Sequence, residues 1–120
     1  MTSLPGPVTE AVAEQLADAM FALSAPSRVL ILGFLLDGSR SVSDLTEALG
    51  MEQSAVSHQL RVLREHNLVR AEKAGRRRLY ALYDEHVAAL LHAGLQHILR
   101  DHPGSASRHL EPVLPAEGAS

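Results

Sequence analysis

The segment from Asp84 to His102 is rich in side chains that can bind a metal ion. It contains four histidines, His86, His92, His97 and His102, with Asp84 at its start. His86 and His97 are eleven residues apart, so on a helix they lie within about 20° of one face. Their separation along the helix axis is about 16 Å, which is too far for one ion. A single chain therefore supplies only part of a site.

Two copies of this helix packed antiparallel would bring His86 of one chain beside His97 of the other. Close approach would be allowed by the small residues of the segment, which are Ala88, Ala89, Ala93 and Gly94. The pattern predicts two equivalent sites between subunits. Carboxylate and imidazole ligands without sulfur suit Ni²⁺, Co²⁺ or Zn²⁺. Scattered surface histidines with no bound metal are the alternative.

A second group of residues, from Gln53 to Arg78, suits contact with nucleic acid. It holds seven basic and two acidic residues, a net charge of +5, whereas the whole chain carries −3 and the remainder −8. An expected helix in this region presents short polar and basic side chains on one face, namely Gln53, Ser54, Ser57, His58 and Arg61. Such side chains can hydrogen bond to base edges in the major groove.

Three consecutive arginines, Arg76, Arg77 and Arg78, follow the glycine of an expected turn. Arginines at the tip of a hairpin suit DNA phosphates or the minor groove. A solvated charged surface and an ordinary amphipathic helix are plainer interpretations of the two groups. The order of the surrounding elements favours DNA.

Apolar periodicity predicts helices over residues 9–23, 27–36, 41–49, 53–66 and 84–102. The second helix is apolar on nearly every side, Leu30 and Phe34 included, so we expect it to be the buried centre of the domain. The expected inward-facing residues are Leu45, Ala48 and Leu49 in the third helix and Val56, Leu60 and Leu63 in the fourth. Ser41 and Asp44 form a capping-box pattern. The third and fourth helices are short and joined by a turn containing Gly50, which is the helix-turn-helix signature. Residues 68–73 and 77–83 roughly alternate between apolar and polar side chains, and residues 74–76 between them can form a turn. This pattern predicts a β-hairpin with a basic tip.

The predicted fold is mainly α with a β-hairpin wing: a winged helix-turn-helix of four helices, a hairpin and a last helix. Residues 1–8 are expected to form a flexible arm, 9–102 the DNA-binding and dimerisation domain, and 103–120 a disordered tail. A chain of 120 residues has a small core, and we expect a homodimer through the first and last helices.

Composition excludes several classes of protein. Cysteine is absent, which excludes disulfides, thiolate metal sites and cysteine nucleophiles. No apolar run is long enough to span a membrane and no secretory signal is present, so a cytoplasmic location is expected. The chain lacks a phosphate-binding glycine loop and an HExxH motif, so we expect no enzyme. A pure protein-docking helix would more often present large apolar anchors than the polar face beginning at Gln53.

Three stretches of the chain resemble the ArsR/SmtB family of winged helix-turn-helix repressors. They are Leu-Ser-Ala-Pro-Ser-Arg at 23–28, Gln-Ser-Ala-Val-Ser-His-Gln-Leu-Arg-Val-Leu at 53–63 and Gly-Arg-Arg-Arg-Leu-Tyr at 75–80. The resemblance covers about residues 10–102 and is closest to nickel- and cobalt-sensing members from actinobacteria. It implies a dimer that occupies operator DNA, blocks transcription, and is typically released when a metal binds.

The resemblance also implies a ligand set for the metal. Asp84, His86 and His97 match three ligands of the site that the family carries in its last helix. The fourth falls on Arg100, which cannot bind a cation. Asp101, four residues after His97, is the substitute we expect.

His102 and His109 are weaker substitutes for the fourth ligand. The cysteine-containing site that the family has in its third helix is absent, as is the N-terminal histidine arm of some nickel sensors. We expect a repressor that responds to Ni²⁺, or to Co²⁺ or Zn²⁺, with no metal required for folding. A repressor without metal sensing, regulated by a protein co-regulator or another ligand, is the alternative.

Overall fold

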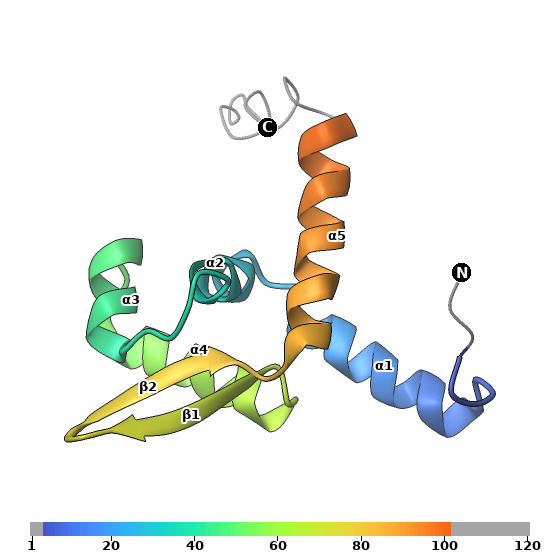
Figure 1. The fold of residues 1–120 in the computed structure, drawn as a ribbon, viewed down its shortest axis with the longest axis horizontal. Helices are drawn as coiled ribbons and strands as arrows, with labels where there is room; N and C mark the ends of the chain where they lie inside the picture. Colours follow the sequence, from blue (N-terminus) through green and yellow to red (C-terminus); the bar gives the residue numbers. More distant parts are fainter. Residues whose placement is uncertain (1–3, 102–120) are drawn as a thin grey trace. The chain divides into compact units, whose positions relative to one another are not determined.

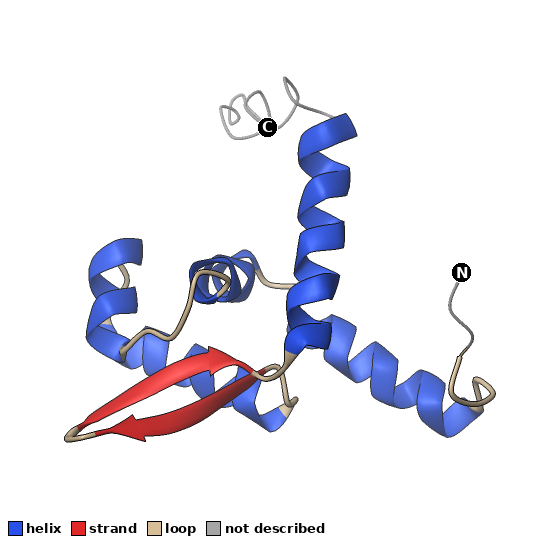
Figure 2. Ribbon diagram, in the orientation of Figure 1, coloured by secondary structure: helices blue, strands red, loops and turns tan. Residues whose placement is uncertain are grey.

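The computed structural model describes residues 4–101, which form five helices and one hairpin (Figures 1 and 2). The elements are α1 (Glu10–Ala22), α2 (Pro26–Leu35), α3 (Val42–Leu49), α4 (Gln53–Glu65), β1 (Val69–Ala74), β2 (Arg77–Leu82) and α5 (Glu85–Asp101). This order confirms the predicted fold class. The chain forms two compact units, with the division in the sequence between Asp84 and Glu85.

The first two helices begin where the sequence predicts. The Thr9 hydroxyl accepts a hydrogen bond from the Val12 N–H at 3.2 Å, which caps α1. Pro26 occupies the first turn of α2, where its missing N–H costs no hydrogen bond. The prediction that α2 is buried on nearly every side is only partly right. Leu32 is fully buried, but Leu30 is 55% exposed.

The third helix is fixed at both ends by local hydrogen bonds. The Ser41 hydroxyl accepts from the Asp44 N–H, and the Ser41 N–H donates to the Asp44 carboxylate at 3.0 Å, so the predicted capping box is confirmed. Gly50 ends α3 with a φ of 68°, a left-handed conformation that favours glycine. Leu45 is buried, but Ala48, predicted to face inward, is exposed.

The fourth helix is strongly amphipathic. Its inner residues Val56, Leu60 and Leu63 are almost completely buried and form much of the core with α2, α3 and β1. Asn67 leaves the helix with a φ of 56°, which asparagine tolerates better than most residues. The chain then enters the hairpin through the buried Leu68.

The hairpin pairs β1 with β2 in an antiparallel register that runs from Val69 opposite Leu82 to Ala74 opposite Arg77. Two residues, Gly75 and Arg76, connect the strands, and Gly75 has the positive φ that such a turn requires. The wing is also joined to the loop before α3. Arg40 and Tyr80 exchange two backbone hydrogen bonds of 2.9 and 2.7 Å.

The last helix runs over 17 residues, close to the predicted range. Over the described residues no single helix is long and apolar enough to cross a membrane. Only α1 and α2 taken together, with a 90° bend at their junction, have the length and composition of a membrane span. The predicted tail at 103–120 lies outside the described residues, as do His102 and His109. The predicted domain limits therefore stay predictions.

Candidate nucleic-acid interface

The outer face of α4 presents every residue that the sequence predicts to read DNA. Gln53, Ser54, Ser57, His58 and Arg61 are all exposed, while the opposite face of the helix is buried in the core. Ser54, Ser57, His58 and Arg61 line a hollow of about 260 Å³. The buried face holds the helix rigidly, and the exposed face offers hydrogen-bond donors and acceptors for a ligand.

His58 and Arg61 are joined across one turn of α4. The Arg61 Nη2 lies 3.2 Å from the His58 Nδ1. A guanidinium only donates hydrogen bonds, so the His58 Nδ1 must accept. The neutral ring then carries its hydrogen on Nε2. In this arrangement His58 offers an N–H donor for an acceptor atom on a base edge.

The back of α4 is tied to the junction between α1 and α2 by Arg28. Its Nε donates to the Ala22 carbonyl oxygen, and its Nη1 donates to the Gln59 Oε1 at 3.0 Å. Arg28 is the last residue of the first stretch that resembles the ArsR/SmtB family. Sequence reasoning gave it no role, because its partner Gln59 is 31 residues away along the chain.

The three wing arginines differ in their surroundings. All three are exposed, but the Arg77 Nη2 donates to the Ser41 Oγ at 3.0 Å and lies 3.4 Å from the Asp44 Oδ2. Among residues 4–101, Arg76 and Arg78 have no hydrogen bond or ion pair with another side chain. Hydrogen bonds from the Ser41 N–H and hydroxyl, helped by the charge of Arg77, lower the pKa of Asp44.

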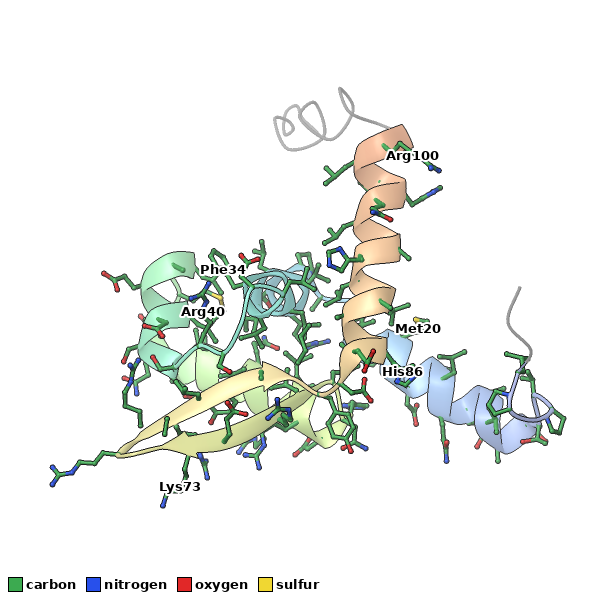
Figure 3. All side chains as sticks on the ribbon, in the orientation of Figure 1. Met20, Phe34, Arg40, Lys73, His86 and Arg100 are labelled. Carbon is green, nitrogen blue, oxygen red and sulfur yellow. The ribbon has the colours of Figure 1, made fainter. Side chains whose placement is uncertain are left out.

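Glu72 on β1 forms a second polar contact between the wing and the loop before α3. It accepts hydrogen bonds from Arg70 and, at 3.2 Å, from the Ser39 hydroxyl. The bond from Arg70 is the main cause of the lowered pKa of Glu72. Lys73, by contrast, extends away from the hairpin (Figure 3). The positive charges of Arg70 and Arg77 are therefore partly neutralised by acidic partners, whereas those of Arg76 and Arg78 are not within the described residues.

Comparison with known proteins identifies the kind of domain that carries this surface. Residues 25–71 match the family described as bacterial regulatory protein, arsR family. The HTH-type transcriptional regulator NmtR of Mycobacterium tuberculosis is 50% identical over 103 residues, 86% of each chain. This chain belongs to the arsR family.

Solved structures agree with this assignment. The solution structure of apo-NmtR has a TM-score of 0.69 and 46% identity, and covers 98% of this chain and 95% of its own. A homodimeric winged helix-turn-helix DNA-binding domain from Mycobacterium bovis has a TM-score of 0.69 and 30% identity, and covers 85% and 92%. The arsR-family protein is therefore a DNA-binding transcriptional regulator and not an enzyme, as the sequence predicted.

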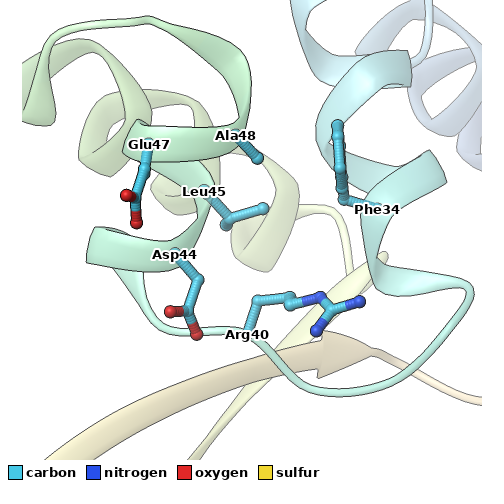
Figure 4. Close-up of a pocket in the computed structure, with 6 residues that line it drawn as sticks. All are labelled: Phe34, Arg40, Asp44, Leu45, Glu47 and Ala48. Carbon is cyan, nitrogen blue, oxygen red and sulfur yellow. The ribbon is translucent and has the colours of Figure 1, made fainter.

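A second hollow, of about 380 Å³, lies in the same compact unit of this regulator. Phe34 of α2 faces Leu45 and Ala48 of α3 across it, with Arg40 and Asp44 at one end (Figure 4). The sequence predicted Phe34 as core, whereas it is only half-buried. Phe34 and Ala48 are incompletely buried because they line this hollow.

The predicted metal ligands of the regulator are not gathered in one chain. His86 and His97 are exposed residues of α5, eleven positions apart on one helix, and Asp84 precedes it. Within residues 4–101, no three histidine or acidic side chains come together as a metal site. The side chain of Asp101 and all of His102 lie outside the described part.

Proposed function

We propose that this arsR-family regulator is a homodimeric repressor that inserts α4 into the major groove of operator DNA. The observation that carries the proposal is the amphipathic character of α4, with one face buried and the other exposed. Three apolar residues hold it in the core, while five polar or basic residues face outward, four of them around a hollow. A recognition helix needs both a rigid back and a polar face at the base edges.

Each side chain of the outer face suits a particular contact. Gln53 can form paired hydrogen bonds with adenine, and Arg61 can bind guanine or a phosphate. His58, which is exposed and carries its N–H on Nε2, suits an acceptor such as guanine N7 or O6. Arg76 and Arg78 of the wing are suited to phosphates or to the minor groove.

Dimerisation is supported by an apolar stripe on α1. Val12, Leu16 and Met20 follow one another at four-residue intervals and are 46, 55 and 43% exposed (Met20 is labelled in Figure 3). α5 also exposes large apolar residues, Leu90, Ile98 and Leu99. Such stripes are buried in a partner when a helix serves as an interface. The regulator would act in the cytoplasm, where its operator lies.

The proposed signal is Ni²⁺, with Co²⁺ or Zn²⁺ as other candidates, bound between the last helices of the two subunits. The donor set fits such an ion: Asp84 supplies oxygen and His86 supplies nitrogen from one chain, and His97 supplies nitrogen from the other. Asp101 is the proposed fourth ligand. A bound ion would hold these side chains together, and a difference in its affinity for the free and DNA-bound forms would couple it to transcription.

One observation favours a repressor without metal sensing of its own. Arg100 stands where the family resemblance expects a ligand, and its guanidinium would repel a cation there. In that version a protein co-regulator or another ligand supplies the signal. The two versions share the DNA-binding surface and differ only in α5.

A calorimetric titration of the full-length protein with Ni²⁺, paired with DNA binding to the upstream promoter fragment, separates these versions. The variants are His97→Ala and, as a matched control on the same helix, His92→Ala. Submicromolar nickel binding that is lost only in His97→Ala and that changes DNA affinity supports the sensor. Weak binding that is indifferent to His97 supports the alternative. No preference for the promoter over a scrambled duplex rejects the repressor itself.

A further inference from the structure

We propose that Arg77 is a positioning residue that anchors the wing to the start of α3, and that the phosphate contacts are left to Arg76 and Arg78. The effect on DNA rests on the proposed function, whereas the anchor itself is a property of the free protein. The sequence makes the three arginines look equivalent. The structure distinguishes Arg77 from its two neighbours.

The wing is joined to one short stretch of chain, residues 39–44, at three points. Arg40 and Tyr80 exchange backbone hydrogen bonds of 2.9 and 2.7 Å. The Ser39 hydroxyl donates to Glu72 at 3.2 Å. The Arg77 guanidinium donates to the Ser41 hydroxyl at 3.0 Å and pairs with Asp44. We call the contact of Arg77 with Ser41 and Asp44 the wing anchor.

The position of Arg77 on β2 allows the wing anchor to fix the direction of the hairpin. Tyr80 fixes one point of the strand, and Arg77 is three residues nearer the turn, about 10 Å away along an extended chain. Glu72, the other attached residue of the wing, pairs with Leu79 beside Tyr80, so these two attachments lie close together. A hairpin held only there can pivot about them, whereas a further attachment at Arg77, nearer the turn, fixes its direction. The wing anchor therefore sets where the turn and its arginines point.

Ser41 and Asp44, which accept the contact of Arg77 in the wing anchor, are themselves held in place. Ser41 is 6% exposed, and its side chain and backbone N–H are already bound to Asp44 in the capping box. Asp44 thus has a fixed carboxylate that faces the wing. Arg77 is attached to the first turn of the first helix of the helix-turn-helix, which orients the wing relative to α3.

Charge explains why Arg77 is a poor phosphate ligand here. Its positive charge lies beside the carboxylate of Asp44, so a phosphate contact would require the guanidinium to leave that partner. The pair is 60 and 45% exposed, and ion pairs this open contribute little to stability. The role of the contact is therefore orientation of the wing rather than stabilisation of the fold.

The first test measures the salt dependence of binding to the promoter fragment by the full-length protein. Removing one bound phosphate from the interface reduces the slope of log affinity against log salt by about 0.9. We expect Arg78→Gln, the matched control, to reduce the slope by that amount. Arg77→Gln should weaken binding about threefold to fivefold, the size of an exposed ion pair, with the slope unchanged.

A double-mutant cycle with Asp44→Asn tests the pairing. Asn retains an oxygen for the Ser41 N–H and removes the charge that faces Arg77. Asp44→Asn should weaken binding as Arg77→Gln does, the double variant should bind no more weakly than either single variant, and Arg77→Lys should recover part of the affinity. A lowered slope in Arg77→Gln, stronger binding by Asp44→Asn, or no effect of Arg77→Gln would each overturn the wing anchor.

Hydrogen exchange of the free protein tests the anchor without DNA. The Tyr80 N–H, bonded to the Arg40 carbonyl oxygen, should exchange faster in Arg77→Gln than in the wild type, and Arg78→Gln should leave it unchanged. Equal rates in all three proteins contradict the anchor. If the wild type binds no promoter DNA, the proposed function fails, and this exchange measurement still decides the anchor.

Discussion

α4 and α5 both carry polar side chains spaced along one helix, but only α4 presents a complete surface within one chain. Ser54, Ser57, His58 and Arg61 lie within two turns and line one hollow. His86 and His97 lie three turns apart on α5 and need a second chain to complete a site. A surface built on one helical face can be derived from one sequence, whereas a site shared between chains depends on their pairing.

The largest expected effect concerns the core that supports α4. Leu60 is 1% exposed, and Leu60→Ala should lower the free energy of unfolding by about 2–5 kcal/mol, through reduced burial and the cavity left behind. Ser54→Ala, on the exposed face of the same helix, should change it by less than about 0.5 kcal/mol. Denaturant unfolding monitored by circular dichroism measures both. Similar decreases in the free energy of unfolding for the two variants would mean that α4 does not have one buried and one exposed face.

The next effect concerns the outer face of α4. Arg61→Ala should weaken binding to the promoter fragment by about 1–3 kcal/mol if Arg61 makes paired hydrogen bonds with a guanine. It would also remove the bond that orients His58, so selection from a random duplex library should show relaxed preference at neighbouring positions. An unchanged preference would assign Arg61 to phosphate contact alone.

A smaller effect is expected on α5. Arg100→His places a nitrogen ligand where the family resemblance expects one, and it should tighten nickel binding about tenfold, or about 1.4 kcal/mol. Calorimetry measures the change, and Leu99→His on the neighbouring position is the control. If both variants gain equally, the added histidine binds nickel by itself, and the proposed intersubunit site is not involved.

The smallest effect is a pH dependence of stability from the two carboxylates beside the wing. The pKa values of Asp44 and Glu72 are lowered in the folded protein, so their contribution is fully present above the unfolded values and is lost as the pH falls through the folded values. This occurs in the acid range below about pH 4. Urea unfolding at several acid pH values should show less of this loss in Asp44→Asn. An identical pH profile would contradict the assignment.

Local signals in the sequence predicted most of the fold. The Ser41–Asp44 capping box, Gly50 and Gly75 each act through neighbouring residues, and the structure has the elements that they predict. The apolar positions Val56, Leu60 and Leu63 correctly gave the buried face of α4. Burial within one helix depends on a period that the sequence displays directly.

Contacts between distant residues could not be predicted in this way. Arg77 and Asp44 are 33 residues apart, and Arg28 and Gln59 are 31 apart, so no spacing rule connects them. An arginine in a basic run has the same sequence signal whether it binds a phosphate or a carboxylate. The exposure of Leu30, contrary to the predicted burial of α2, has a related cause, because a uniformly apolar helix does not show which side faces the core.

The most direct test of the account compares binding of the promoter fragment and of a random duplex to wild type, Ser57→Ala and Arg78→Ala, by fluorescence anisotropy at fixed salt. If α4 reads sequence and the free wing arginines bind phosphates, Ser57→Ala reduces the preference for the promoter, whereas Arg78→Ala weakens both duplexes by the same factor. Equal loss on both duplexes in both variants would contradict the account, because α4 would then make no contact that depends on base sequence.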